Sequence, residues 1–555
     1  MAPDATTQGP AAPDPMAQDA RTQDGRTQGP LTPGPLTEGP LTPGPLTLGR
    51  WTTDRAATDP SRTAIVDRGV TVSYGELEAR ATALAHALGE AGHGRGARIA
   101  TVTGSTADQV VLLFACAKAG AMLVPLSWRL TAGELAEQLA LADPSLLLIE
   151  DDHRPLAEAA LDRLAGHGIR SVPGAPAAPI PTTTLGAAGA ESSVPDALRP
   201  VGHGTPADDD GLLMLFTSGT TSAPKAVVLT HANCAWANLA LSRATPLTPD
   251  DVVLQLLPQH HVAGWNIQPL LAWWVGARVV LERTFDAGRA LALIERHRIT
   301  ATMGVPTVFR ALIQHPDFAA RDLSSIRTAI VGGGMLDPRT AERLAERGVA
   351  VQQGYGLTEA APNVTICHDE SDAGTVGRAY PHVDLALLID GRVEHGPGTG
   401  ELLVRGPAVF QGYFRDPEAT AAAHHGPWLR TGDLVARDGA GRIRIVDRVK
   451  DIVRSGGESI APIEVELALL EHPAIADAAV AGVPSERWGE ELVAWLVLAE
   501  PAEEASIRAH LDGRIADFKH PKQYLVVDGI PRTTSGKPLR RALTAAYTAE
   551  RTDAR

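Results

Sequence analysis

Cysteine is scarce in this chain of 555 residues, which contains only Cys116, Cys234 and Cys367. The three lie far apart, with no CxxC pair and no Cys/His spacing typical of zinc ligands. A disulfide framework and a structural zinc site are therefore not expected. A reducing cytoplasm is the predicted location.

A net positive charge and long hydrophobic runs are also lacking. The formal net charge is −15, which argues against a nucleic-acid surface, although an anionic nucleotide needs only a local cluster of donors. The most apolar window, residues 110–126, is interrupted by Lys118 and predicts a buried helix followed by a strand, with a membrane span as the minor alternative. The first residues have neither the basic nor the apolar segment of a secretory signal.

The length and the 44% hydrophobic content predict at least two domains with large cores. Residues 1–49 are rich in Pro, Gly, Thr and Gln and repeat G-P-L-T-x from Gly29 to Thr47, so we expect a disordered tail that acts as a spacer rather than a binding segment. Ser73 with Glu76 forms a capping-box pattern, which predicts the start of a helix. Apolar strands and helices then alternate, which predicts α/β layers. We expect a large N-terminal domain at 50–446, and the last stretch, 447–555, is long enough to be a smaller domain of its own.

A polar loop between two short apolar strands is the most distinctive stretch. Leu215 to His231 reads LFTSGTTSAPKAVVLTH, with strands expected at 212–216 and 227–229 and a tight turn at 217–222. Backbone N–H groups, hydroxyls and Lys225 make a concave donor surface suited to a polyphosphate. The common nucleotide motif GxxxxGK[ST] is absent.

Five blocks follow one another in a fixed order. They are TSGTTSAPK (217–225), GYGLTEAAP (354–362), TGDL (431–434), VDRVKDIVRSGGESIAPIEVE (446–466) and PRTTSGKPLR (531–540). Together they resemble the adenylate-forming superfamily, which includes acyl-CoA synthetases, peptide adenylation domains and luciferases. The resemblance runs from about Trp51 to Leu543, and the segment 125–139 looks like acyl- and aryl-CoA ligases. It implies an α/β fold with several sheets in the N-terminal domain and a small, mobile α+β C-terminal domain.

The resemblance implies ATP and Mg²⁺ as ligands. Thr217 and Glu359 match positions that hold Mg²⁺, Tyr355 matches an aromatic residue against adenine, and Asp433 with Arg448 matches the groups that bind the ribose hydroxyls. The nucleotide-binding residues so implied are Thr217, Ser218, Gly219, Thr220, Thr221, Lys225, Gly333, Gly354, Tyr355, Asp433 and Arg448.

Catalysis is assigned by the same resemblance to Lys537, Thr358 and Glu359. Lys537 matches the lysine that bridges the acyl carboxylate and the α-phosphate, and Thr358 matches a phosphate contact. Lys450 falls at the hinge about which the small domain of relatives rotates. In relatives this rotation presents the face that corresponds to Gly456 and Gly457 to the tunnel that takes the pantetheine arm of coenzyme A.

The acyl pocket is bordered in relatives by the segment LPQHHVAGWN (257–266). His261, Trp265, Gly334 and Ala360 are the pocket residues that the resemblance implies, although His261 and Trp265 are also compatible with core packing. No Asp or Glu occurs from 257 to 266 to pair with an α-ammonium group, so an α-amino acid substrate is disfavoured.

Two residues depart from the family's pattern, since Ser222 and Ala226 stand where glycine is usual. A side chain at positive φ costs roughly 1 kcal/mol or more, so either residue is expected to be unfavourable if the backbone there is left-handed.

The implied function is ATP-dependent activation of a fatty or aromatic carboxylic acid to an acyl-adenylate, followed by thioester formation with coenzyme A. The enzyme alternatives are transfer to an acyl carrier protein, and activation of another oxyanion such as nitrite in aryl diazotisation. A nucleotide-binding scaffold is the non-enzyme alternative.

Overall fold

The computed structural model describes residues 46–166, 182–184, 205–217, 224–455, 458–485, 487–533 and 536–553. The predicted tail lies outside these residues up to position 45. Its last four positions, 46–49, belong to the folded part instead, because Leu48 is fully buried in the main core. Helix α1 (Gly49–Thr58) follows directly.

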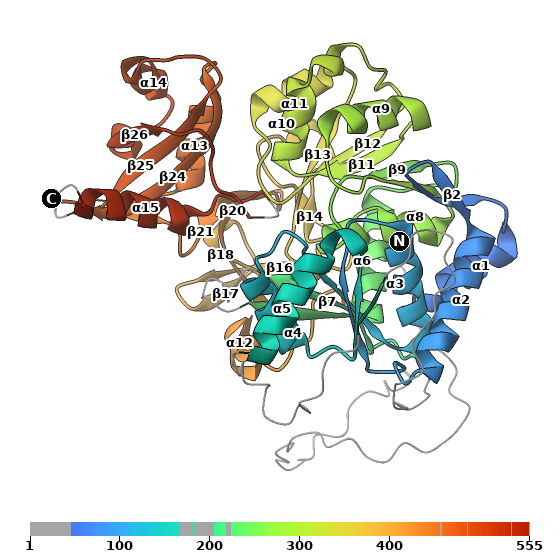
Figure 1. The fold of residues 1–555 in the computed structure, drawn as a ribbon. Helices are drawn as coiled ribbons and strands as arrows, with labels where there is room; N and C mark the ends of the chain where they lie inside the picture. The colour runs from blue at the N-terminus through green and yellow to red at the C-terminus, as the bar shows by residue number, and fades with distance from the viewer. Residues whose placement is uncertain are drawn as a thin grey trace, which may run out of the picture. The chain divides into compact units, whose positions relative to one another are not determined.

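The largest sheet has nine strands in the order β15-β14-β13-β12-β11-β9-β10-β1-β2. The six strands from β13 to β1 in this order run parallel, and antiparallel strands flank them. Helices α9, α10 and α11 pack beside it through a shared apolar cluster (Figure 1). The bounds are β1 Thr63–Asp67, β2 Val70–Ser73, β9 Val252–Gln255, β10 Arg278–Leu281, β11 Ala301–Gly304, β12 Thr328–Val331, β13 Val351–Tyr355, β14 Thr365–Ile366, β15 Arg378–Ala379, α9 Ala287–His297, α10 Pro306–Gln314 and α11 Pro338–Ala345.

A six-stranded sheet in the order β6-β5-β3-β4-β7-β8 carries the polar loop at its β7–β8 end. Helix α2 starts with the capping box that Ser73 and Glu76 predict. Nearly every residue of α3 is buried, and β4 follows it, which confirms the buried helix and strand expected at 110–126. The bounds are α2 Tyr74–Glu90, β3 Arg98–Val102, α3 Ala107–Ala119, β4 Met122–Leu126, α4 Ala132–Ala142, β5 Leu146–Ile149, α5 Arg154–Gly166, β6 Thr182–Thr184, β7 Gly211–Thr217, β8 Lys225–Thr230, α6 His231–Ala244, α7 Ala263–Asn266 and α8 Pro269–Val275.

A third sheet is antiparallel, with β17-β16-β18-β20-β19 in order and β21 paired to β20. Its bounds are β16 Asp384–Ile389, β17 Arg392–Glu394, β18 Gly398–Arg405, α12 Pro417–Ala422, β19 His424–His425, β20 Trp428–Arg437 and β21 Ile443–Arg448. Because β21 stays hydrogen-bonded to β20 as far as Arg448, this sheet continues past the expected domain boundary at 446.

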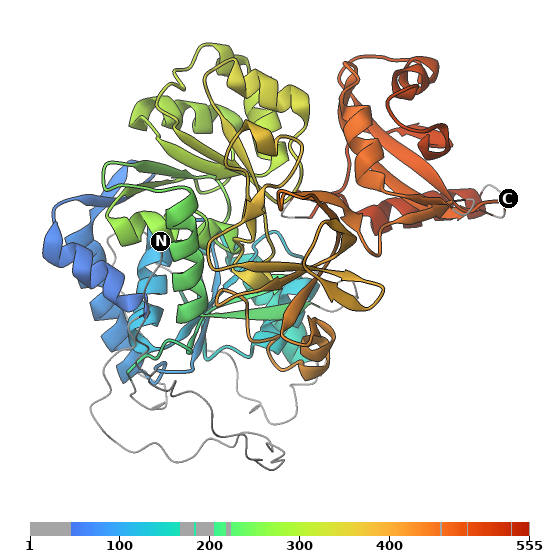
Figure 2. The same ribbon diagram turned by 180° about the vertical axis from the view of Figure 1, so that it is seen from behind.

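The C-terminal part, from Val453 onward, has its own sheet (β23-β22-β25-β24, with β26 beside β25) and its own apolar clusters. Figure 2 shows its two long strands, β24 and β25, with helices alongside. The bounds are β22 Val453–Ser455, β23 Glu458–Ile460, α13 Pro462–Leu470, β24 Ile475–Ser485, β25 Gly489–Leu498, α14 Glu504–Leu511, β26 Gln523–Val526 and α15 Arg540–Asp553. The expected fold class, a large multi-sheet α/β part and a smaller α+β part, is confirmed. The division into domains at 446/447 stays a prediction.

In the described part of the chain, no helix is both long enough and apolar enough to cross a bilayer.

Candidate active site

The stem of the polar loop is an antiparallel hairpin in which Thr217 pairs with Lys225. The strands expected on either side of the loop are confirmed as β7 and β8. The loop residues Ser218, Gly219, Thr220, Thr221 and Ser222 lie outside the described residues. Ala226 is buried in β8 and is not among the described residues with positive φ, so the backbone cost expected for a side chain does not arise there.

An acidic turn follows β13 and lies close to this hairpin. Thr358, Glu359 and Ala360 form one 3₁₀ turn, and Ala361 ends it with a left-handed φ of 57°. The Tyr413 hydroxyl donates a hydrogen bond of 2.9 Å to Glu359 Oε1. Lys225 Nζ lies 4.9 Å from the centroid of the same tyrosine ring.

The two expected ribose residues are brought together by strand register, because Asp433 on β20 pairs with Arg448 on β21. Arg448 Nε lies 2.6 Å from Asp433 Oδ1, and Tyr355 donates from its hydroxyl to Asp433 Oδ2. Burial and the negative charge of Asp433 hold the pKa of Tyr355 well above its usual value, so the phenol stays a donor. The residues expected at adenine and ribose therefore form one hydrogen-bonded cluster.

Lys537 enters this region from the C-terminal part. Its side chain is accessible to water, yet surrounding protein desolvates the ammonium group enough to be the main cause of a lowered pKa. Arg448 and Lys450 lower the pKa further, while Asp433 and Glu359 oppose the shift. The ammonium group therefore lies in the electrostatic field of the nucleotide residues.

The loop before Lys537 is fixed by two arginines and one aspartate. Arg532 Nη1 donates to the Gly536 carbonyl at 2.7 Å, and Arg532 Nη2 lies 2.6 Å from Asp477 Oδ1 on β24. Arg310 on α10 reaches the same Asp477 oxygen at 3.0 Å. Gly536 has a φ of 81°, and a Cβ there would lie 3.2 Å from Thr307 Oγ1 on α10. These contacts hold the Lys537 loop against α10.

The expected hinge, Lys450, is exposed just after β21. Burial by neighbouring atoms lowers its pKa, and Arg448 and Arg541 add to the shift against the opposing Asp451 and Asp433. The expected tunnel residues Gly456 and Gly457 lie outside the described residues.

The segment expected at the acyl pocket folds tightly around Gly264, where a Cβ would lie 2.4 Å from the Pro258 carbonyl oxygen. Burial, with a contribution from Arg129, lowers the pKa of His261 to about 4, so its imidazole is neutral near pH 7. Trp265 is fully buried in the main core and donates from Nε1 to the Gln259 carbonyl at 2.6 Å. Trp265 is therefore packed in the core, which is one of the two roles that the sequence allowed for it.

Glycines border the same region at the ends of β12 and β13. Gly333 has a φ of 76°, and a Cβ on Gly334 would contact the Pro306 ring at 3.4 Å. Gly354 is buried in β13, and Ala360 is 2% exposed. Whether His261, Trp265, Gly334 and Ala360 contact an acyl group stays a prediction.

Three residues of this arrangement were missed from the sequence: Tyr413, Arg310 and Asp477. Tyr413 stands alone between Gly412 and Phe414, and the other two lie more than 160 positions apart. Only the Gly-Tyr pair after the strand residues 398–405 could have drawn attention to Tyr413.

The donor chemistry fits Mg²⁺. No group of three or more His, Cys, Asp or Glu side chains suited to a metal occurs among the described residues. Mg²⁺ does not need one, since it is typically held by one or two carboxylates together with substrate phosphates and water. The Glu359 carboxylate and the Thr217 hydroxyl are oxygen ligands of this kind.

Comparison with known proteins agrees with this arrangement. Residues 52–414 match the family described as AMP-binding enzyme, and residues 464–537 match the AMP-binding enzyme C-terminal domain. The chain is 37% identical to a feruloyl-CoA synthase of Amycolatopsis sp over 87% of its length and 95% of that protein. It is also 37% identical to an indoleacetate–CoA ligase of Aromatoleum aromaticum over 86% of its length and 94% of that protein.

Among solved structures, ATP-bound MatB from Rhodopseudomonas palustris superimposes with a TM-score of 0.77 at 31% identity, covering 90% of this chain and 99% of that one. The resemblance seen in the sequence is thereby confirmed, and the enzyme interpretation is favoured over a scaffold. The chain belongs to the family of AMP-binding enzymes, as an ATP-dependent acid:CoA ligase of the adenylate-forming superfamily.

Proposed function

We propose that this ligase activates an aromatic carboxylic acid and that the clustered residues bind the nucleotide as follows. Asp433 and Arg448 bind the ribose hydroxyls, Tyr355 lies against adenine, and Lys225 with the loop at 218–221 binds the triphosphate. Mg²⁺, held by Glu359 and Thr217, would screen phosphate charge. The observation that carries the proposal is the cluster of nucleotide residues, in which Tyr355 donates to Asp433 Oδ2 and Arg448 Nε lies 2.6 Å from Asp433 Oδ1.

In the first half-reaction a carboxylate oxygen of the acid attacks the α-phosphorus of ATP. The bond from that phosphorus to the bridging oxygen breaks, and pyrophosphate leaves with the electron pair. Lys537 lies between the acyl carboxylate and the α-phosphate, where its positive charge offsets the charge that accumulates on the phosphoryl oxygens. Thr358 contributes a phosphate contact from the adjoining turn.

In the second half-reaction the thiolate of coenzyme A attacks the acyl carbon, and AMP leaves. We infer that the part from 447 to 555 rotates about Lys450, withdrawing Lys537 and presenting Gly456 and Gly457 to the pantetheine arm. Each arrangement then completes a different catalytic set. Coenzyme A is the acceptor that the family implies.

An aromatic acid is supported by two observations. Three relatives at 37% identity are named for aromatic acids: two feruloyl-CoA synthases and one indoleacetate–CoA ligase. The pocket segment 257–266 contains no carboxylate, and burial together with the nearby Arg129 lowers the pKa of His261 to about 4, so the segment itself carries no charge near pH 7. A neutral wall suits an apolar ring better than a second charge.

The test is ATP–pyrophosphate exchange with a panel of four acids: ferulate, indole-3-acetate, octanoate and palmitate. We expect exchange with at least one aromatic acid to exceed that with either fatty acid by tenfold or more. Exchange restricted to the fatty acids would reject the aromatic assignment. No exchange with any acid would reject the activation step itself.

The acceptor is tested in a second stage. Coenzyme A or a phosphopantetheinyl carrier protein is added with the preferred acid, and products are identified by mass. We expect the coenzyme A thioester; a loaded carrier protein or a diazo product from added nitrite would identify one of the alternative acceptors. The cytoplasmic location stays a prediction from cysteine content.

A further inference from the structure

Tyr413 contacts two side chains that the proposed function assigns to different parts of one ligand. Its hydroxyl donates to Glu359 Oε1 at 2.9 Å, and its ring lies under Lys225 with 4.9 Å from Nζ to the ring centroid. In the described part of the chain no ion pair joins Lys225 to an acidic side chain. The tyrosine therefore stands between a cation and an anion that would otherwise attract each other.

The backbone around Tyr413 is fixed from both sides. Phe410 donates its N–H to the Glu359 carbonyl at 2.8 Å, and Phe414 donates its N–H to the Ala226 carbonyl at 2.8 Å. Tyr413 itself forms a bridge with Val227. Residues 410–414 thus connect the first residues of β8, directly after Lys225, to the turn that carries Glu359.

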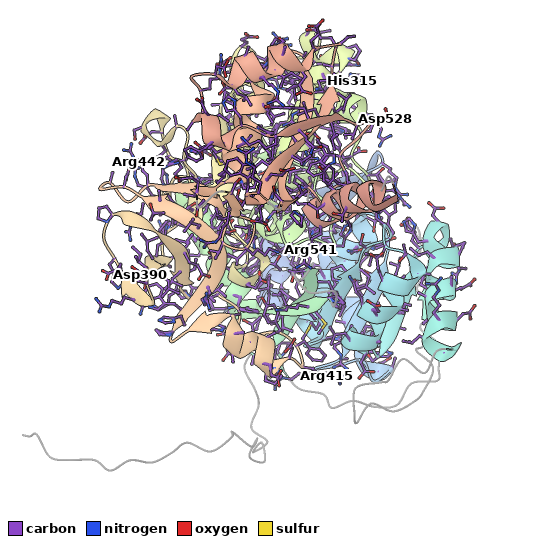
Figure 3. All side chains as sticks on the ribbon, turned by 90° about the vertical axis from the view of Figure 1, so that its left-hand side faces the viewer. His315, Asp390, Arg415, Arg442, Asp528 and Arg541 are labelled. Carbon is purple, nitrogen blue, oxygen red and sulfur yellow. The ribbon has the colours of Figure 1, made fainter. Side chains whose placement is uncertain are left out.

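The far end of this segment is anchored as well. The Tyr413 N–H donates to Thr420 Oγ1 at 2.9 Å. Arg415, labelled in Figure 3, pairs with Asp143 at 3.1 Å after α4. The Tyr413 side chain therefore has little freedom to follow either partner if that partner moves.

A direct Lys225–Glu359 pair would neutralise both groups before any ligand arrives. Opposite unit charges in contact attract strongly near a protein surface, where the effective dielectric is well below that of water. An aromatic ring holds a cation by its face without removing its charge, and a phenol hydroxyl orients a carboxylate without a counter-charge. Both charges then remain available to the triphosphate and to Mg²⁺.

We propose that Tyr413 is a positioning residue that holds Lys225 and Glu359 apart, so that the ammonium group meets the triphosphate and the carboxylate meets Mg²⁺. This inference rests on the proposed nucleotide roles of those two residues. It assigns separate functions to the two ends of one side chain. The hydroxyl sets how tightly Mg²⁺ binds, and the ring sets how tightly ATP binds.

The test uses the full chain and equilibrium binding of ATP by titration calorimetry, without any carboxylic acid, over a range of Mg²⁺ concentrations. Tyr413→Phe keeps the ring and removes the hydrogen bond to a charged group. We expect the half-saturating Mg²⁺ concentration to rise roughly 10-fold while ATP affinity at saturating Mg²⁺ stays within about 2-fold. Tyr413→Leu removes both contacts, and ATP affinity should also fall, by roughly 5-fold.

A double-mutant cycle shows whether the hydroxyl acts through Glu359. In a Glu359→Gln background, Tyr413→Phe should cause no further rise in the Mg²⁺ requirement, because the carboxylate it orients is gone. Additive effects of the two substitutions would overturn the proposal. If Tyr413→Leu does not fold, Tyr413→Phe and this cycle still decide the question.

Tyr524 provides the matched control. It also carries a cation over its ring, with Arg508 Cζ 4.7 Å from the centroid, but it belongs to β26 in the C-terminal part. Tyr524→Phe should change neither the half-saturating Mg²⁺ concentration nor the ATP affinity. If Tyr413→Phe behaves like this control while the wild type exchanges pyrophosphate, the inference fails and the proposed function stands. If the wild type shows no exchange, the proposed function fails by itself.

Discussion

The charges that act on Lys537 come from residues that precede the C-terminal sheet. Asp433 and Glu359 attract its ammonium group, whereas burial and two neighbouring cations lower its pKa. A lysine held in this way serves as a positioned charge, and such charges contribute on the order of 10² to 10³ in rate.

Replacing Lys537 by alanine should therefore slow acyl-adenylate formation by about 10² or more. Conversion of supplied acyl-adenylate to the thioester should remain within about 2-fold, because the lysine acts only on the first half-reaction. The measurement is a rapid-quench assay of each half-reaction. Equal losses in both would contradict the role given to Lys537.

His231 predicts a pH dependence of stability. It is fully buried, its Nδ1 accepts from the Leu48 N–H at 3.2 Å, and burial lowers its pKa from 6.5 to about 4. The unfolded chain therefore binds the proton more readily, so the free energy of unfolding should fall as the pH drops from about 6.5 towards 4. Urea unfolding at pH 7.5 and 5.0 measures this loss, and His231→Asn should reduce it. An unchanged pH dependence in the variant would exclude His231 as the cause.

At the scale of elements, the order of strands and helices follows from local patterns. The Ser73 capping box and the apolar window at 110–126 predicted their elements correctly, because caps and hydrophobic periodicity act within a few residues. Asp433 and Arg448 were both expected at the ribose, but only through the family's motifs. Their pairing was not predicted, since the register of β20 and β21 is not encoded locally.

Contacts between distant elements could not be predicted in this way. Tyr413 meets Glu359 across 54 positions, and Arg310 meets Asp477 across 167. No periodicity links such residues, because their proximity depends on how the sheets pack. The left-handed backbone of Ala361, with a φ of 57°, was likewise not signalled by its residue type.

Asp477 joins α10 to the Lys537 loop, and this predicts an effect on one half-reaction. Asp477→Asn weakens the contacts to Arg310 and Arg532 that hold the Gly536 carbonyl. Adenylation should slow by about 10-fold, since charged hydrogen bonds contribute roughly 1.5–3 kcal/mol. Thioester formation from supplied acyl-adenylate should be unchanged or faster. Asp512→Asn, at an exposed site of the same part, is the control; a similar effect there would exclude a specific role for Asp477.

At the scale of the whole molecule, the proposed mechanism has the C-terminal part turn between the two catalytic steps while the nucleotide site stays intact. Lys450 lies at the change from the third sheet to the C-terminal sheet. Among the described residues its N–H donates to no backbone carbonyl, and it is not among those with positive φ. Proline at this position therefore removes no backbone hydrogen bond donated by residue 450.

Lys450→Pro should leave adenylation within about 3-fold and slow thioester formation by more than about 10-fold, because proline restricts the rotation about φ that a hinge needs. Single-turnover measurements of both steps test this, with Lys450→Ala as the control for loss of charge. A proline variant that matches the alanine variant in both steps would show that the chain turns elsewhere.

The strand pairing of Asp433 with Arg448 has a consequence for the acyl-adenylate, which is a reactive mixed anhydride. Both residues belong to the third sheet and lie before Lys450, so a turn about Lys450 leaves their pairing in place. On the proposed roles, the ribose remains bound while the catalytic lysine departs. The intermediate is then retained between the two reactions. Its rate of hydrolysis depends on the pairing of β20 with β21 more than on how fast the C-terminal part turns.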